Sequence, residues 1–238
     1  MSDPLAELNR LQERDLELDA IREDQSRTPE ELIAARAHFK KLEAQLADLQ
    51  DQLRDVRVAY RRADLERQDL LGKRDKAKTA ASNASTPKEQ TQYSEQVRQI
   101  TGLIEEIDGE ILPLMEQTEK LEAQVEGVKA KVEEARPSLD GLESANKARV
   151  EQLEETFQAK RFERDSIAEE IPLNIVKEYE SIRRARKGTG LAKIAKAGSG
   201  HRCTACNVQL PMHVAQQVYG SNKVVRCPSC GRILWKGE

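Results

Sequence analysis

The sequence predicts a mainly α-helical protein, a long antiparallel coiled-coil helical hairpin with a small C-terminal β ribbon. Three observations lead to this fold class. Charged residues make up 34% of the 238 residues and aromatic residues only 3%, which leaves too few large side chains for a thick core. Long stretches repeat apolar residues at coiled-coil spacing. All four cysteines lie in the last 36 residues.

Coiled-coil periodicity runs through two stretches of the chain. In both, apolar residues alternate at spacings of three and four, as they do along the seam of a left-handed coiled coil. The first stretch consists of Leu32, Ala35, Phe39, Leu42, Leu46, Leu49, Leu53, Val56, Tyr60 and Ala63. The second consists of Val97, Ile100, Ile104, Ile107, Ile111, Leu114, Thr118, Leu121, Val125, Val128, Val132, Ala135, Leu139 and Leu142.

The segment between the two stretches predicts the tip of a hairpin near residues 82–88. Thr86 and Glu89 form a capping-box pattern around Pro87, which is typical of a helix start. We therefore expect residues 1–182 to form an antiparallel hairpin within one chain. The interrupted seam makes a parallel dimer of two chains the weaker alternative, while a monomer and a dimer of hairpins both remain open.

Helix breakers lie at matching heights on the two arms. A second Thr-Pro-x-Glu pattern begins at Thr28, and Pro137 and Gly141 lie roughly opposite on the returning arm. We expect joints near 26–29 and 137–141, which either act as hinges or only accommodate packing. Pro113 has no breaker opposite it, so we expect a kink there and no helix end.

Charge is divided sharply along the chain. Residues 1–180 contain 28 basic and 41 acidic residues, whereas residues 181–237 contain eleven basic residues and no Asp or Glu. Such an asymmetry points to contact with nucleic acid or with a membrane. The alternative is that the basic end docks on the acidic helices of its own chain.

The cysteines form two pairs, Cys203 with Cys206 and Cys227 with Cys230, separated by twenty residues. Two CxxC knuckles at this separation predict one structural Zn²⁺ bound by four thiolates. A disulfide framework would need an oxidising compartment, and a thioredoxin-type motif would need a larger βαβ domain. We expect a zinc ribbon over 201–238, preceded by a basic helix end and linker over 183–200.

The chain resembles the bacterial C4-type zinc-ribbon, coiled-coil protein family. The resemblance is carried by the hairpin pattern, by Ile171-Pro-Leu-Asn-Ile-Val-Lys-Glu-Tyr179 and by Cys227-Pro-Ser-Cys230-Gly-Arg-Ile-Leu-Trp235, where the family usually has Tyr at the last position. It implies nucleic-acid binding, which is predicted for that family. It also implies an adaptor role, because some members resemble chaperone-like proteins that engage a sigma factor or secretion components.

Nucleic-acid binding, to DNA or RNA or both, is the first functional hypothesis. A basic surface without acidic residues binds phosphates without reading bases. Tyr219 and Trp235 could stack on bases, although core packing beside the zinc is the preferred role of Trp235. The candidate contacts are Arg183, Arg184, Arg186, Lys187, Lys193, Lys196, Arg202, Lys223, Arg226 and Arg232.

The sequence leaves two other functional classes. The alternative hypothesis is a protein-protein adaptor whose coiled coil and ribbon engage partner proteins. An enzyme is the weakest interpretation, because no phosphate-binding G-x-x-x-x-G-K-[ST] loop or catalytic constellation is visible. No stretch approaches the ~20 apolar residues of a membrane helix, and residues 1–10 lack the pattern of a secretory signal. We therefore expect a non-enzymatic cytoplasmic protein without membrane contact.

Overall fold

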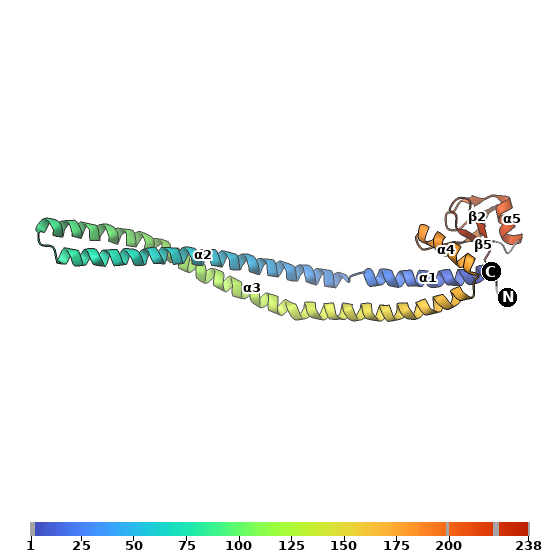
Figure 1. Cartoon of the computed structure of the whole chain (residues 1–238), viewed down its shortest axis with the longest axis horizontal. Coiled ribbons are helices and arrows are strands. Elements are labelled where there is room, and N and C mark those ends of the chain that lie inside the picture. Colours follow the sequence, from blue (N-terminus) through green and yellow to red (C-terminus); the bar gives the residue numbers. More distant parts are fainter. Residues whose placement is uncertain (1–2, 199, 221–223, 238) are drawn as a thin grey trace. The chain divides into compact units, whose positions relative to one another are not determined.

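The computed structural model describes residues 3–198, 200–220 and 224–237, which belong to two compact units (Figure 1). The hairpin unit is Glu30–Glu143. The base unit combines Met1–Pro29 with Ser144–Glu238, so both ends of the sequence contribute to it. The two units are described separately below.

The hairpin unit is formed by two long antiparallel helices (Figure 1). They are α2, Glu30–Ser82, and the first part of α3, which as a whole spans Pro87–Glu169. The predicted seam is buried over much of its length, which confirms the coiled-coil hairpin. Its buried members are Leu32, Phe39, Leu42, Leu53, Ile100, Ile104, Ile107, Ile111, Leu121, Val128 and Val132. None of the helices in the described ranges is both long and apolar enough to cross a membrane.

The tip of the hairpin is a short turn at residues 83–86. The Glu89 amide donates to Thr86 Oγ1 at 3.2 Å, and the Thr86 amide donates to Glu89 Oε2 at 3.2 Å. These reciprocal hydrogen bonds are a capping box, and they satisfy amides that the first turn of α3 would otherwise leave unpaired. The sequence pattern at the tip therefore forms the structure that it predicts.

The two expected joints differ. On the first arm, helix α1, Pro4–Ser26, ends three residues before α2 begins at Glu30. On the returning arm no break occurs at 137–141, because α3 continues through both Pro113 and Pro137. Proline removes one helical hydrogen bond but does not end a helix whose flanking turns are held by packing. Here Val132, Ala135 and Leu139 surround Pro137 and pack in a cluster with Phe39 and Leu42.

Three helical segments form one side of the base unit: α1, the end of α3, and α4, Leu173–Ala185. Helix α1 is capped by Asp3, whose side chain accepts from the Leu5 amide at 3.1 Å, and Pro4 occupies its first turn. Leu5, Leu8 and Leu11 of α1 are buried, because their spacing places them on one face.

The ribbon is a five-stranded sheet with the strand order β3-β2-β1-β5-β4. Strands β1 and β5 are parallel, and the other neighbours are antiparallel. The strands are β1 Leu191–Ala197, β2 Gly200–Cys203, β3 Gln209–Leu210, β4 Val225–Arg226 and β5 Ile233–Trp235. Helix α5, Met212–Gly220, lies between β3 and β4 in the sequence.

The two faces of the sheet belong to two apolar clusters. Leu191, Ile233 and Trp235 pack with α1 and α4, whereas Ile194 and Leu234 pack with α5 and three of the cysteines. Successive residues of β5 therefore enter different clusters, as alternation along a strand requires. The ribbon is thus not an appendage, because one of its faces completes the core of the base unit.

Residues 183–200, expected to be a basic helix end and linker, contain the helix end but also a strand in place of most of the linker. Helix α4 ends at Ala185, a turn follows in which Lys187 has φ +52° and Gly188 φ +96°, and β1 then forms the centre of the sheet. The residues of β1, Leu-Ala-Lys-Ile-Ala-Lys-Ala, have weak strand propensity. Pairing with β2 on one side and β5 on the other overrides that preference.

Candidate metal centre and its support

The two cysteine pairs occupy turns of the same form. Cys203 ends β2, and Cys227 directly follows β4. The carbonyl oxygen of Cys203 accepts from the Asn207 amide at 2.8 Å, and that of Cys227 accepts from the Gly231 amide at 2.9 Å. Asn207 and Gly231 both have left-handed backbones, with φ values of +58° and +75°. Asn and Gly adopt that conformation more readily than other residues, so the local sequence favours both knuckles.

The four sulfur atoms lie at the spacing that a tetrahedral metal requires. Cys203 Sγ is 3.9 Å from Cys230 Sγ, Cys206 Sγ is 3.7 Å from Cys227 Sγ, and all four lie within 4.8 Å of one another. A tetrahedron with Zn–S bonds of about 2.3 Å has edges of about 3.8 Å. All four cysteines are free thiols in this structure. The donor set therefore fits one Zn²⁺ in a closed, structural site.

Two of the four thiols resist ionisation. Burial raises the pKa of the Cys203 thiol to about 12 and also raises the pKa of Cys227. At Cys230 burial again opposes ionisation, but hydrogen bonds with Arg232, Cys227 and Cys206 together outweigh it and lower the pKa to about 7. Gathering four thiolates in one place therefore needs a divalent cation, which compensates their charge.

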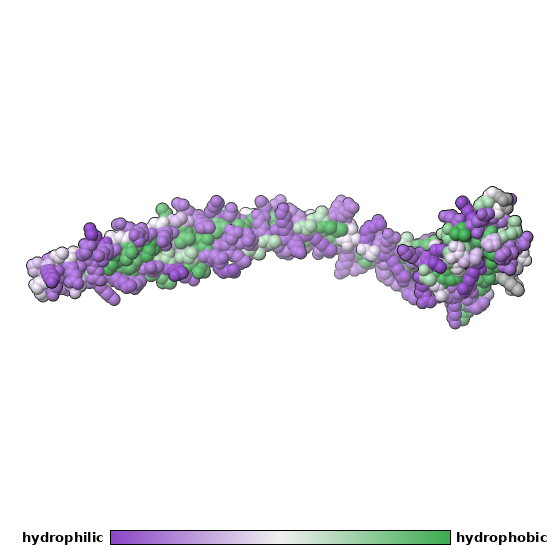
Figure 2. All heavy atoms as spheres, turned by 90° about the horizontal axis from the view of Figure 1, so that it is seen from above, coloured by the Kyte–Doolittle hydropathy of each residue, from purple (hydrophilic) through white to green (hydrophobic). Residues whose placement is uncertain are grey.

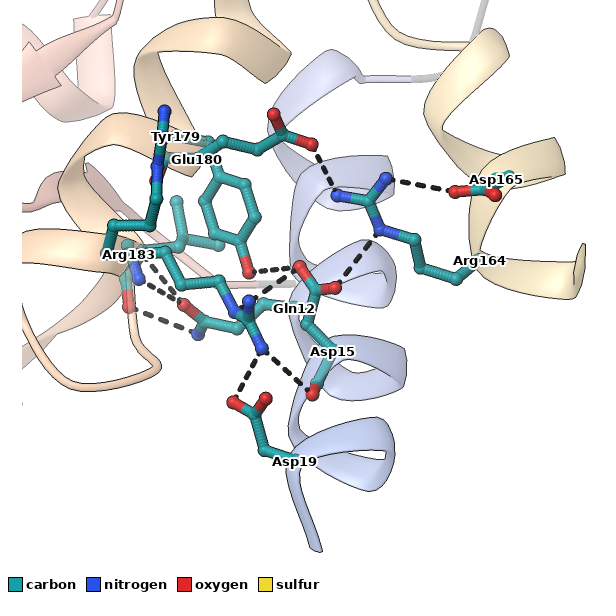
Figure 3. Close-up of polar contacts among 11 residues, drawn as sticks. Gln12, Asp15, Asp19, Arg164, Asp165, Tyr179, Glu180 and Arg183 are labelled. Atoms are coloured by element: carbon teal, nitrogen blue, oxygen red, sulfur yellow. Dashed lines mark hydrogen bonds and ion pairs between the residues drawn. The ribbon is translucent and has the colours of Figure 1, made fainter. Parts of the chain in front are cut away.

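A buried carboxylate, Asp15 of α1, connects three helices below the ribbon (Figure 3). It accepts from Tyr179 Oη at 2.9 Å and from Arg164 Nε at 3.1 Å. Arg183 donates to the Asp15 carbonyl oxygen at 3.1 Å and to Asp19 Oδ2 at 2.5 Å. Burial, together with the Asp15 carboxylate, raises the pKa of Tyr179 well above its ordinary value, so the phenol keeps its proton and donates it.

Gln12 ties α1 directly to the first strand of the ribbon (Figure 3). Its Oε1 accepts from the amides of Gly190 and Leu191 at 2.9 and 2.8 Å, and its Nε2 donates to the Leu191 carbonyl oxygen at 3.1 Å. A side-chain amide here occupies the hydrogen-bonding position of a neighbouring strand. Gly190 also packs against Tyr179, where an added Cβ would lie 2.5 Å from the ring. Helices α1 and α4 are thereby joined to β1.

Three of the ten predicted nucleic-acid contacts serve the fold of the base unit. Arg183 belongs to the Asp15 network, with its side chain only 20% exposed. Arg226 Nε forms an ion pair with Glu178 Oε1 at 2.6 Å. Arg232 donates to Thr189 and to the Arg186 carbonyl oxygen. The basic segment therefore docks partly on acidic helices of its own chain, which was the alternative interpretation.

Six other predicted contacts are exposed, and none of them forms an ion pair within the described residues. They are Arg184, Arg186, Lys187, Lys193, Lys196 and Arg202. The ammonium of Lys193 lies 5.8 Å from the centroid of Trp235, and Trp235 itself is buried in the apolar cluster with Leu8 and Tyr179. Trp235 therefore packs in a core, as expected, but on the face of the sheet that meets α1 and α4 and not beside the cysteines. Lys223 lies outside the described residues.

Sequence reasoning missed the residues that join the helices to the ribbon. Gln12, Asp15 and Asp19 resemble the solvated face of a coiled coil, because nothing in their local pattern marks them as buried. One sequence signal was available. The leucines at positions 5, 8, 11 and 18 form an apolar helix face before Thr28, outside the predicted seam, and such a face indicates that this segment packs against another part of the chain.

Fold and site together define a coiled-coil hairpin protein with a C4 zinc ribbon. The chain belongs to the family of the CT398-like coiled coil hairpin domain, which matches residues 11–188. A C4-type zinc ribbon domain matches residues 202–234, a range that includes all four cysteines.

Solved structures and curated sequences show the same relationship. CT398 from Chlamydia trachomatis superposes with a TM-score of 0.86 at 14% identity and covers 98% of both chains. The HP0958 protein from Helicobacter pylori gives a TM-score of 0.62 at 21% identity, over 99% of this chain and 98% of that one. The uncharacterised protein Rv2229c of Mycobacterium tuberculosis is 22% identical over 85% of each chain. At these identities the structural likeness establishes the fold.

Proposed function

We propose that the protein binds nucleic acid through phosphate contacts made by the base unit. One observation carries the proposal. After Arg183 and Arg226 have paired with Asp19 and Glu178, six of the predicted contacts remain exposed and without an ion pair in the described structure, in a segment of 57 residues that contains no Asp or Glu. Cations that are not used internally are available to neutralise phosphates and release condensed counterions.

The arrangement favours backbone recognition over base reading. The exposed cations lie at the end of α4, in the turn that follows it and on two strands, so they do not line one face of a helix that could enter a groove. Lys196 is paired with His201 in the β1–β2 register, and the His201 ring lies 5.3 Å from the exposed ring of Tyr219. Aromatic faces beside cations support binding of single strands. The proposed activity is binding without catalysis, in the cytoplasm.

Fluorescence anisotropy with labelled single- and double-stranded DNA and RNA tests this function. The variant replaces Arg184, Arg186 and Lys187 with Gln in zinc-loaded protein. We expect affinity to fall at least tenfold at low salt, and the slope of log K against log salt to fall by up to about 0.9 per lost duplex phosphate contact.

The matched control replaces three exposed cations of the hairpin unit, Lys40, Lys41 and Lys78, with Gln. This control changes net charge equally, so its affinity should stay within about twofold of wild type. Absence of binding by the wild-type protein at low salt, or equal losses in the two variants, contradicts the proposal.

A second candidate function is that of a protein adaptor, and a specific surface favours it. Residues 203–222 contain no Lys, Arg, Asp or Glu in a chain that is 34% charged. Val208, Met212 and Tyr219 in this stretch are 42%, 59% and 50% exposed. Exposed apolar side chains in a stretch of sequence without charged residues suit a protein partner. The variant with Gln at Arg184, Arg186 and Lys187 separates the two functions. If it loses nucleic-acid binding but still binds a protein partner, the two functions use different surfaces.

A further inference from the structure

Several seam residues in the middle of the hairpin unit are only partly covered by the two helices. Seam residues at either side, such as Phe39, Ile104 and Val132, are buried. Between them Leu53, Ile111 and Leu121 are buried as well, but other seam residues are only half-buried, and small or polar residues occupy two of these positions. The half-buried members are Val56, Tyr60, Ala63, Leu114, Thr118 and Val125. Two helices alone therefore do not close the seam here.

Large apolar side chains also project outward in the same region, where Figure 2 shows apolar surface along the hairpin. Val58 and Leu65 of α2 are 63% and 61% exposed, and Leu112 and Met115 of α3 are 60% and 44% exposed. Val58 lines a hollow of about 560 Å³, and Met115 lines an adjoining hollow of about 470 Å³. The two hollows share Arg57 and Arg61, so they form one groove along one side of the seam.

The two walls of this groove carry opposite charges at matching heights. The α2 wall carries three arginines, with Asp64 at one end, and the α3 wall carries three glutamates. The Arg57–Glu122 ion pair at 2.7 Å fixes the register across the groove. Because the helices are antiparallel, one residue forward on α2 corresponds to one residue back on α3. From one end to the other the opposed positions are Arg54 with Glu126, Arg57 with Glu122, and Arg61 with Glu119.

We propose that this groove is the interface for a second copy of the same chain, which forms a four-helix bundle of two hairpins. A partner helix whose charges all have the same sign would be attracted to one wall and repelled by the other. A copy rotated about a two-fold axis parallel to the hairpin places its glutamate wall opposite the arginine wall at the same height, and the converse holds on the other side. A two-fold axis across the groove would set arginine against arginine.

The charge pattern determines which side of the seam forms the interface and in which direction the two hairpins run relative to each other. The hollow on the other side of the seam has Asp55, Arg62 and Glu66 on its α2 wall and Glu110 on its α3 wall, so it is acidic on balance and two copies would repel each other there. In the selected arrangement the two tips, each next to Ser85, point in the same direction. This interface is independent of the proposed nucleic-acid binding, because it lies entirely in the hairpin unit.

Paired charge variants of the full chain test the interface. Variant A carries Arg54→Glu and Arg61→Glu, which makes both walls acidic. Variant B carries Glu119→Lys and Glu126→Lys, which makes both walls basic. We expect wild type to sediment as a dimer at tens of micromolar, each variant alone to self-associate at least about tenfold more weakly, and an equimolar mixture of A and B to form a heterodimer.

Controls separate this interface from general charge effects and from misfolding. The variant Glu106→Lys with Glu110→Lys changes the charge as much as variant B, but on the other side of the seam, and it should dimerise as wild type does. The helical circular dichroism of every variant must match wild type. A spin label at Ser85→Cys in zinc-loaded protein should report neighbouring tips. A monomeric wild type, a mixture that fails to associate, or widely separated tips overturns the proposal.

Discussion

A single carboxylate, Asp15, holds a tyrosine and two arginines from later parts of the chain. It is 3% exposed, whereas the Arg164 and Arg183 side chains are 15% and 20% exposed. A buried ion pair contributes little net stability when it is intact, but removal of one partner leaves the other charged and desolvated. The main energetic effect of losing Asp15 would therefore come from the two desolvated arginines that it leaves without this counter-ion, and not from the lost attraction itself.

Asp15→Asn should lower the free energy of unfolding of the base unit by about 3 kcal/mol, because two arginines would lose their shared counter-ion. Urea denaturation followed by fluorescence of Trp235, the only tryptophan, measures this quantity in the base unit. The control is Asp51→Asn at an exposed position of the hairpin unit. It should change the free energy of unfolding by less than about 0.5 kcal/mol, which is the usual limit for surface substitutions. Equal effects of the two substitutions would contradict the role of Asp15.

At the scale of elements, the sequence predicts what is local and misses what is distant. The seam, the capping box and the cysteine knuckles depend on residues within a few positions of one another, and all three are present. Strand β1 depends on partners at residues 200–203 and 233–235, and the hydrogen bonds of Gln12 reach residues 178 and 179 positions away. No local pattern encodes such pairings. The ligand set of the zinc site was therefore predictable from sequence, whereas its attachment to α1 was not.

The approach of α4 to β1 can be tested at Gly190. Gly190→Ala would place a Cβ 2.5 Å from Tyr179 Cδ2 and 2.7 Å from its carbonyl oxygen, so the backbone must shift. We expect a loss of about 1–3 kcal/mol in the free energy of unfolding of the base unit. Gly127→Ala is the matched control, because nothing lies within 4 Å of its Cβ and alanine favours a helix by about 0.5–1 kcal/mol. If both substitutions stabilise the protein, the contact with Tyr179 does not constrain the fold.

At the scale of the whole molecule, zinc stabilises more than the ribbon. The strand that follows the second knuckle, β5, contributes Leu234 to the cluster around the cysteines, and it contributes Ile233 and Trp235 to the cluster with α1 and α4. Loss of the metal therefore reaches both faces of the sheet. The hairpin unit has its own apolar clusters, which contain no residue of the ribbon.

Removal of zinc, by a strong chelator or by Cys203→Ser with Cys206→Ser, should unfold the sheet and release α1 and α4 from it, because the metal supplies much of the folding energy of so small a ribbon. Hydrogen exchange should show loss of protection at Gly190 and Leu191, whereas the amides around Ile104 remain protected. Helical circular dichroism should fall only slightly. Retained protection at Gly190 in metal-free protein would show that α1 holds the strand without zinc.

The composition of the base unit also fixes an order of events during synthesis. Helix α1 leaves the ribosome well before Tyr179, Leu191 and Ile233, against which it packs, have been made. Meanwhile Glu30–Glu143, made in between, already contains both arms of the hairpin. Formation of the hairpin before chain release would shorten the effective loop between α1 and its later partners and reduce the entropy lost on closing it. A nascent chain stalled before residue 171 would thus carry a folded hairpin and an N-terminal helix whose leucines have no core to enter.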